Sequence, residues 1–163
     1  MKVLIEALKQ EDACALLAFE SKNREFFERT VPSRGEAYYQ DEHFQESLQA
    51  LLAEQAEGTA FLSLIKSEQG IILGRMNLVD IDQKRASAEL GYRVGEEAAG
   101  KGVASSALGL LLGEYVQQLG IREVHAKTTA DNIASQKVLL KNGFVFQQAD
   151  AQGFLHYHWT LQV

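Results

Sequence analysis

The sequence predicts a mixed α/β fold, and the order of its strand and helix patterns supports this prediction. Strand patterns at residues 59–66 and 71–81 are joined by a short turn and lead into a third strand at residues 88–94. A glycine-rich loop and a helical pattern at residues 103–119 come next. The strand expected at residues 122–129 then lies parallel to 88–94, because crossovers of this kind are right-handed. We therefore expect a mostly antiparallel sheet with one central parallel pair, which opens a cleft where the two strands diverge.

Length and composition indicate one domain over residues 1–163. The 163 residues are 46% hydrophobic and 23% charged, which is typical of a soluble globular protein. A formal net charge of -6 argues against nucleic-acid binding, because such proteins are usually basic. No apolar run approaches the ~18 residues of a membrane span. We expect a cytoplasmic protein with no nucleic-acid or membrane partner, present as a monomer or homodimer.

The first third of the chain is predicted to supply one strand and two helices. Residues 2–8 form the strand, and residues 10–21 form a helix whose acidic start suits the positive end of the helix dipole. Residues 36–57 carry apolar side chains at helical spacing and end at Gly58, a common helix stop. Between the helices, residues 23–35 hold two phenylalanines, three arginines and the only proline. This segment is too aromatic for a plain linker.

The last part of the chain is predicted to form a helix and a hairpin. Residues 131–141 form the helix, and residues 144–147 and 154–161 form the closing strands. In the final strand His156 and His158 share one face, but a metal site needs three or four ligands and surface histidines are the simpler interpretation. The single cysteine, Cys14, excludes an intrachain disulfide and is expected to be buried and inert.

The glycine-rich loop is predicted to bind a phosphate. In the preceding strand the apolar residues alternate with polar ones, as expected for a strand with one buried face. Gly100 and Gly102 allow the backbone to turn so that successive N–H groups converge on one anion. The helix from residue 103 directs its free amides and positive dipole end to the same place.

Three phosphate-binding loops share this outline. Residues 95–101 match a P-loop except that Gly102 replaces the hydroxyl residue that would ligate Mg²⁺. Residues 100–105 approach the dinucleotide fingerprint, but Ser105 replaces its third glycine. The acyl-CoA loop, Gln/Arg-x-x-Gly-x-Gly/Ala, fits residues 99–104 except at Ala99. The acyl-CoA interpretation explains the most residues.

The loop and its neighbours resemble the GNAT superfamily of acyl-CoA-dependent N-acetyltransferases. Glu-Leu-Gly-Tyr at 89–92, Gly-Lys-Gly-Val-Ala at 100–104 and Asp-Asn-x-x-Ser at 131–135 are similar to its RimJ/RimL branch, which acetylates protein N-termini. Asn23-Arg-x-Phe-Phe27 and Pro32-x-Arg34 extend the likeness over nearly the whole chain. The resemblance implies the GNAT fold, with about seven mostly antiparallel strands, one splayed parallel pair and about four helices.

The resemblance also implies a site for acetyl-CoA that needs no metal. Backbone N–H groups near Tyr92 and Val94 are expected to bond the pantetheine arm as an added strand would. Asn132 is implied as a further cofactor contact, although capping the following helix would explain it equally. The pyrophosphate is expected to lie on the loop and the helix start, unless these form only a glycine-rich turn. The residues expected to contact it are Gly100, Lys101, Gly102, Val103, Ala104 and, through its hydroxyl, Ser105.

Two residues are candidates for proton transfer. Glu89 lies on the cleft strand and is proposed to draw a proton from the amine through water, unless it only forms a surface pair with Arg93. By resemblance, Ser135 stands near the thiol sulfur and acts as the acid, while helix capping is the alternative. Many members of the superfamily have a tyrosine at the next position, where this chain has Gln136.

The predicted reaction is direct transfer of an acetyl group from acetyl-CoA to a primary amine. The Rim-like segments favour the N-terminal α-amino group of a protein such as a ribosomal protein. By resemblance, residues 23–35, with Phe26, Phe27 and Arg34, form one wall of the acceptor site, although packing in the core would explain the phenylalanines equally. Three alternatives stay open: a small-molecule amine such as a polyamine or antibiotic, a non-catalytic acyl-CoA sensor, and a nucleotide-dependent switch.

Overall fold

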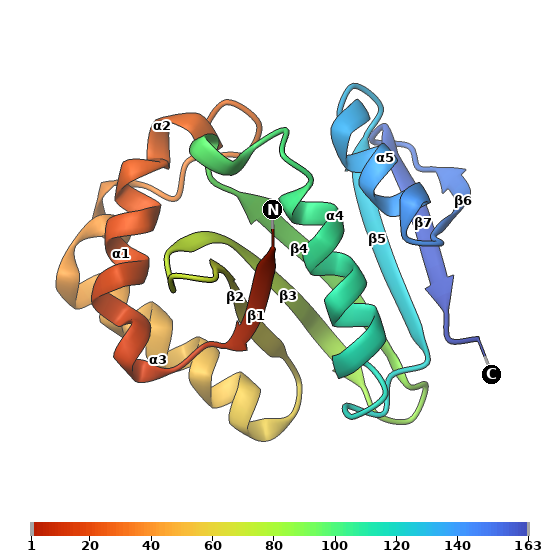
Figure 1. Ribbon diagram of the computed structural model, residues 1–163, viewed down its shortest axis with the longest axis horizontal. Coiled ribbons are helices and arrows are strands. Elements are labelled where there is room, and N and C mark those ends of the chain that lie inside the picture. Colours follow the sequence, from red (N-terminus) through yellow and green to blue (C-terminus); the bar gives the residue numbers. More distant parts are fainter. Residues whose placement is uncertain (1, 163) are drawn as a thin grey trace.

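A seven-stranded mixed sheet forms the centre of the protein (Figure 1). The computed structural model describes residues 2–162, and its strands follow the order β1-β2-β3-β4-β5-β7-β6. All neighbours are antiparallel except β4 and β5. The strands are β1 Val3–Ala7, β2 Phe61–Ser67, β3 Ile72–Asp82, β4 Ser87–Val94, β5 Glu123–Thr129, β6 Val145–Ala149 and β7 Phe154–Thr160.

Helices cover both faces of this sheet. The apolar side chains of α1 and α3 pack with β2 on one face, and those of α4 pack with β1, β4 and β5 on the other. In Figure 1, α1, α2 and α3 gather at one end of the sheet, and α5 lies at the other with β5, β6 and β7. The α-helices are α1 Ala13–Lys22, α2 Arg24–Phe27, α3 Asp41–Glu57, α4 Val103–Leu110 and α5 Ile133–Lys141; shorter helical turns are η1 Gln10–Asp12, η2 Glu36–Tyr39, η3 Glu96–Ala98 and the π-helical η4 Leu111–Tyr115.

The parallel pair is short, and this shortness creates the site. β4 and β5 pair at Ser87 with Glu123, at Ala88 with Val124 and finally at Glu89 with His125. Beyond Glu89 the two strands separate, while β4 stays paired with β3 along its other edge. The predicted splayed sheet is therefore confirmed, and the edge of β4 that faces β5 lacks a strand partner from residue 90 onward.

Three details differ from the sequence-based expectations. The helix expected over residues 103–119 widens to a π-helical turn, in which the Val116 N–H bonds the Leu111 carbonyl. That turn carries Tyr115, whose hydroxyl donates to the Ile5 carbonyl of β1 at 3.0 Å. A fifth, four-residue helix, α2, forms inside the aromatic segment. Cys14 is exposed, so its predicted burial is wrong; α1 buries its neighbours Ala13 and Leu16 instead.

Within residues 2–162, no helix combines the length and the apolar character needed to cross a membrane.

Candidate active site

A cleft of about 850 Å³ occupies the gap between the diverging strands. The glycine-rich loop and the start of α4 form one end of its lining. Residues of α2 and of the segment after it form another wall, and the start of α5 closes the side next to β5. The predicted cleft therefore gathers the glycine loop, both central strands and the aromatic segment around one space.

The glycine-rich loop has the predicted backbone geometry. Gly100 and Gly102 adopt φ angles of 74° and 78°, in the left-handed region that disfavours other residues. Gly102 is the N-cap of α4 and provides no side-chain cap, so the first amides of the helix are left for another acceptor. The loop residues that line the cleft are Gly100, Gly102, Val103, Ala104 and Ser105; Lys101 is exposed and does not line it.

Two buried contacts fix the start of this loop. Asn23 is 6% exposed; its side chain accepts a hydrogen bond from the Glu96 N–H at 2.9 Å and donates one to the Phe19 carbonyl at 3.0 Å. Gly95 lies so close that a Cβ atom there would be 2.9 Å from the Phe19 ring. Asn23 therefore ties α1 to the end of β4, a structural role that local sequence patterns did not reveal.

At the start of α5, different residues cap the helix and contact the opposite side of the cleft, which the sequence alone did not distinguish. The Asn132 side chain accepts a hydrogen bond from the Ser135 N–H at 3.1 Å, so Asn132 is the helix cap. The hydroxyl of Ser135 makes no capping bond and lies 3.2 Å from the hydroxyl of Tyr92 on β4. The alternative of Ser135 as a side-chain cap is therefore wrong, and both Asn132 and Ser135 line the cleft.

Tyr92 and Gln136 complete this part of the site. Tyr92 lines the cleft with Val94, as predicted from β4, but its side chain also takes part. Burial raises the pKa of the Tyr92 hydroxyl, and the hydrogen bond with Ser135 lowers it by a smaller amount. Gln136, at the position where many superfamily members have a tyrosine, donates its amide to the carbonyls of Thr129 and Ala130. The tyrosine of this cleft therefore comes from β4 and not from α5.

Glu89 lies at the apex of the divergence, on the opposite face of β4 from Tyr92. It is exposed, occupies the last register pair before the strands part, and does not itself line the cleft. No ion pair to Glu89 is present among residues 2–162. The alternative pairing with Arg93 is wrong, because the Arg93 guanidinium bonds Glu20 instead. The Glu89 carboxylate is thus exposed to solvent and has no ion-pair partner among the described residues.

Glu20 organises a buried cluster of arginines next to the cleft. Its side chain is 0% exposed and lies 2.7 Å from Arg75 and 3.0 Å from Arg93, with Arg34 at 3.9 Å. Burial lowers the pKa of Arg93, and the Glu20 carboxylate offsets part of this shift. Sequence analysis missed the cluster because Glu20 is 55 residues from Arg75 and 73 from Arg93.

Only some residues of the aromatic segment 23–35 line the cleft. Phe26 and Phe27 line the cleft, and Phe27 is also buried in the core beside α1, so both the packing and the wall interpretations apply to it. Arg34 does not line the cleft; its guanidinium lies over the Tyr38 ring, 4.7 Å from the ring centroid. Arg34 therefore reaches the acceptor end only through the Glu20 cluster.

The histidines of β5 and β7 lie beside acidic side chains or beside each other. His125 lies 3.1 Å from Glu123 and stacks on His158, and His156 lies 2.7 Å from Asp150. No group of three or more His, Cys, Asp or Glu side chains within residues 2–162 has the arrangement of a metal site.

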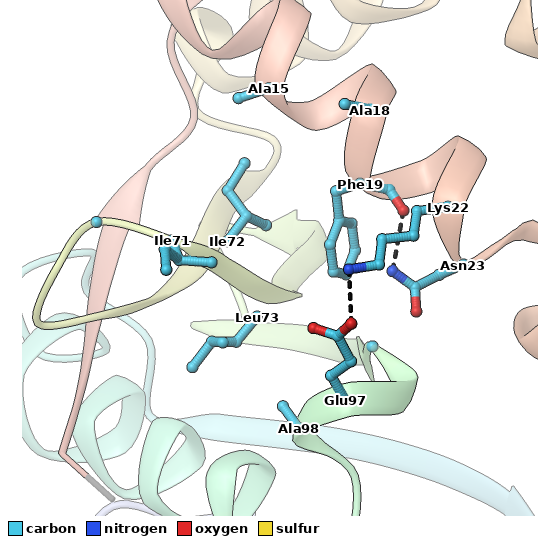
Figure 2. A pocket seen from close by; sticks show the side chains of 12 residues that line it. Ala15, Ala18, Phe19, Lys22, Asn23, Ile71, Ile72, Leu73, Glu97 and Ala98 are labelled. Atoms are coloured by element: carbon cyan, nitrogen blue, oxygen red, sulfur yellow. Dashed lines mark hydrogen bonds and ion pairs between the residues drawn. The ribbon is translucent and has the colours of Figure 1, made fainter.

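A second, smaller cavity of about 380 Å³ includes Asn23 in its lining (Figure 2). Its walls are mostly apolar side chains from α1, the start of β3 and η3. Lys22 and Glu97 face each other at its edge with their charged atoms 2.7 Å apart, as Figure 2 shows. Both of these charges are paired, so the cavity offers no free group for chemistry, and we assign the site to the larger cleft.

The fold and the cleft together define a class of protein. A splayed parallel pair beside an uncapped, glycine-led helix start suits an extended ligand that carries phosphates at one end. The paired hydroxyl groups of Tyr92 and Ser135, and the exposed Glu89 carboxylate where the strands part, suit proton transfer. These are the features of a protein that binds an extended phosphate-bearing ligand and moves protons beside it.

The chain belongs to the GNAT acetyltransferase family, because residues 2–145 match its acetyltransferase (GNAT) domain. It is 30% identical over 107 residues to a ribosomal-protein-serine acetyltransferase of Escherichia coli (strain K12), a match that covers 66% of this chain and 59% of that relative. It is 28% identical over 150 residues to the probable N-acetyltransferase YjcK of Bacillus subtilis (strain 168), covering 87% of this chain and 80% of that protein.

Solved structures support the same fold. The ribosomal L7/L12 α-N-protein acetyltransferase RimL in complex with coenzyme A has a TM-score of 0.89 at 22% identity, covering 99% of this chain and 95% of that one. Spermidine N-acetyltransferase of Vibrio cholerae in complex with coenzyme A and spermine has a TM-score of 0.80 at 15% identity, covering 97% and 95%. The fold is thus shared by structures described with a protein acceptor and with a polyamine acceptor.

Proposed function

We propose that the protein transfers an acetyl group from acetyl-CoA to a primary amine, with the N-terminal α-amino group of a protein, such as a ribosomal protein, as the acceptor. Membership of the acetyltransferase family and the resemblance to the Escherichia coli ribosomal-protein-serine acetyltransferase support this proposal. The loop at Gly100 and Gly102, with the start of α4, is proposed to hold the pyrophosphate through backbone N–H groups. The unpaired edge of β4 is proposed to bond the pantetheine arm.

The charged side chains on the cleft wall are the observation that supports this choice of acceptor. Among the described residues that line the cleft, three are cations and one, Asp131, is an acid. Each cation also lies over the ring of a phenylalanine that lines the cleft. The pairs are Arg29 on Phe26, Arg93 on Phe27 and Lys127 on Phe154, with 5.5, 4.6 and 4.7 Å between the cationic group and the ring centroid.

This arrangement disfavours a polyamine. A polycation would meet three cationic side chains on the wall. Arg93 is paired with Glu20 and Arg29 lies 3.6 Å from Glu96, so Lys127 contributes most of the repulsion between like charges. The aromatic faces that would attract its ammonium groups already carry cations of the protein. An N-terminal peptide brings one ammonium group, backbone hydrogen-bonding groups and apolar side chains, which suit a wall of phenylalanine and arginine. The cleft therefore favours a peptide over a polyamine.

The proposed chemistry needs two protons removed from the nitrogen and one supplied to the sulfur. Glu89 takes the first proton from the ammonium group through water, which leaves a neutral amine to attack the thioester carbonyl directly. The carbon–nitrogen bond forms and the nitrogen releases its second proton to water; the carbon–sulfur bond then breaks, and its electron pair remains on sulfur. Ser135, on the other face of β4 from Glu89, donates a proton to that sulfur. Base and acid thus act from opposite sides of the splayed strand.

A panel of acceptors tests this function. Acetyl-CoA is supplied with synthetic N-terminal peptides of ribosomal proteins, with the same peptides blocked at the α-amino group, and with spermidine. Free thiol and the mass of the product are measured. We expect thiol release with free peptides and none above background with blocked ones. Faster turnover of spermidine would contradict the peptide assignment. Coenzyme A binding without turnover of any amine would indicate that the protein is a non-catalytic acyl-CoA sensor.

A further inference from the structure

We propose that Tyr92 and Ser135 form a two-hydroxyl proton relay to the departing thiolate, with Ser135 next to the sulfur and Tyr92 behind it. Tyr92 is then a positioning residue that also replaces the proton that Ser135 gives up. The inference rests on the proposed acetyl transfer and assigns the side chain of Tyr92, which the loop and strand patterns linked to the cofactor only through its backbone.

The contact bridges the two sides of the cleft. Tyr92 belongs to β4 and Ser135 to α5, and their hydroxyl oxygens lie 3.2 Å apart with either able to donate. Both residues line the cleft. Within residues 2–162 each hydroxyl has the other as its single hydrogen-bond partner. The pair therefore lies where the ligand passes between the separated strands, and it has no structural partner elsewhere that would explain it.

Neighbouring residues leave the pair free for this role. Asn132 already caps α5 by accepting the Ser135 N–H, so the serine hydroxyl is not needed to begin the helix. Gln136 uses its side-chain amide on two backbone carbonyls of the loop before α5. No other tyrosine lines the cleft among the described residues. Tyr92 is thus the phenol that this cleft provides.

Acid strength explains why two hydroxyls are needed. A thiol of the cysteine type has a pKa of about 8.5 and a phenol of about 10, whereas a serine hydroxyl does not titrate in the range of protein side chains. A lone serine that protonates the thiolate would be left as an alkoxide, which is strongly unfavourable. If Tyr92 passes its proton to Ser135 as Ser135 passes its own to sulfur, the final anion is a phenolate. One of the two protons that the nitrogen released to solvent then restores the Tyr92 hydroxyl.

The setting of Tyr92 supports the donor role. Its ring packs against the apolar cluster beneath α4, which fixes the direction of the hydroxyl. Burial raises the pKa of Tyr92, so the hydroxyl keeps its proton near neutral pH and is available as a donor. A phenolate at rest would oppose the departing thiolate instead.

Kinetics of three variants test the relay. Tyr92→Phe, Ser135→Ala and the double variant are compared with Tyr115→Phe. This control removes a hydrogen bond of similar length, from the Tyr115 hydroxyl to the Ile5 carbonyl, and neither residue lines the cleft. We expect kcat to fall at least tenfold in both relay variants, no further fall in the double variant, and Tyr115→Phe to retain wild-type kcat. Turnover by Tyr92→Phe within twofold of wild type, or multiplied losses in the double variant, would overturn the relay.

A binding measurement keeps the relay testable if no amine is turned over. The affinities for coenzyme A and desulfo-coenzyme A are compared from pH 6 to 9. Hydrogen-bond donors favour the thiolate, so the advantage of coenzyme A should grow severalfold as pH rises through the thiol pKa. The growth should disappear in Tyr92→Phe and Ser135→Ala and persist in Tyr115→Phe. An equal increase with pH in all four proteins would contradict the relay. If the increase is lost in the two relay variants but no amine is acetylated, the relay stands and the proposed acceptor is wrong.

Discussion

The two ends of the cleft differ in whether backbone groups or side chains form them. At the end proposed to hold the phosphates, two glycines and the uncapped start of α4 present backbone amides. At the end proposed for the acceptor the wall consists of side chains, with Arg93 over Phe27 and held by the buried carboxylate of Glu20. The first end depends on local conformation, and the second depends on contacts between distant parts of the chain. Substitutions at the first end should therefore act through backbone conformation, and those at the second end through the loss of long-range side-chain contacts. The following predictions test this difference.

The largest expected effect is at Glu20. Glu20→Ala leaves Arg75 and Arg93 without their buried counter-charge, and breaking a buried ion pair destabilises by about 3–5 kcal/mol. Urea denaturation measures the free energy of unfolding. Glu25→Ala, on the exposed surface of α2, is the control and should change it by less than about 0.5 kcal/mol. A loss below about 1 kcal/mol for Glu20→Ala would show that the acceptor end does not depend on this cluster.

Glu89→Gln comes next and acts on turnover without affecting the fold. Removal of the base should lower kcat about 10²-fold at neutral pH, with partial recovery at high pH as the amine deprotonates by itself. Affinity for acetyl-CoA should stay the same, because Glu89 lies on the face of β4 opposite Tyr92. Glu57→Gln, at the exposed end of α3, is the control for loss of one charge. An unchanged kcat in a chemistry-limited assay would remove Glu89 from the mechanism.

Gly102→Ala tests the backbone end. Its φ angle of 78° disfavours any side chain, and the left-handed conformation costs about 1–2 kcal/mol for alanine. Relief of this strain shifts the helix start, so coenzyme A binding by calorimetry should weaken by about tenfold while the Glu20 cluster is unaffected. Gly113→Ala, inside the π-helical turn and with open space around its Cα, is the control and should leave binding intact. Equal binding by both variants would argue against an amide cradle.

The smallest effect on stability is expected at the start of α5. Asn132→Ala removes the observed cap and should lower stability by about 1 kcal/mol. Ser135→Ala removes no cap, so its melting temperature should stay near that of the wild type while its rate falls. Thermal denaturation beside the thiol-release assay separates the two. The opposite result, with Ser135→Ala the less stable variant, would return Ser135 to a structural role.

The same division explains how far the sequence could predict this protein. The splayed pair and the phosphate loop follow from alternation in β4, from Gly100 and Gly102, and from the helix pattern after them, all within one short stretch. The Glu20 cluster was not predicted, because its partners are far away along the chain and nothing local distinguishes Glu20 from an exposed helix glutamate. For the same reason the bond between Tyr92 and Ser135, 43 residues apart, appeared only in the structure.

The close packing around Gly95 has a consequence for how this sequence can vary. A Cβ atom at that position would lie 2.9 Å from the Phe19 ring and 3.1 Å from the Asn23 side chain, closer than ordinary contacts allow. In a library that randomises Gly95 alone, functional clones should therefore retain glycine. Alanine should be recovered there only when position 19 is randomised too and acquires a smaller side chain, so that α1 and the exit of β4 evolve as one unit.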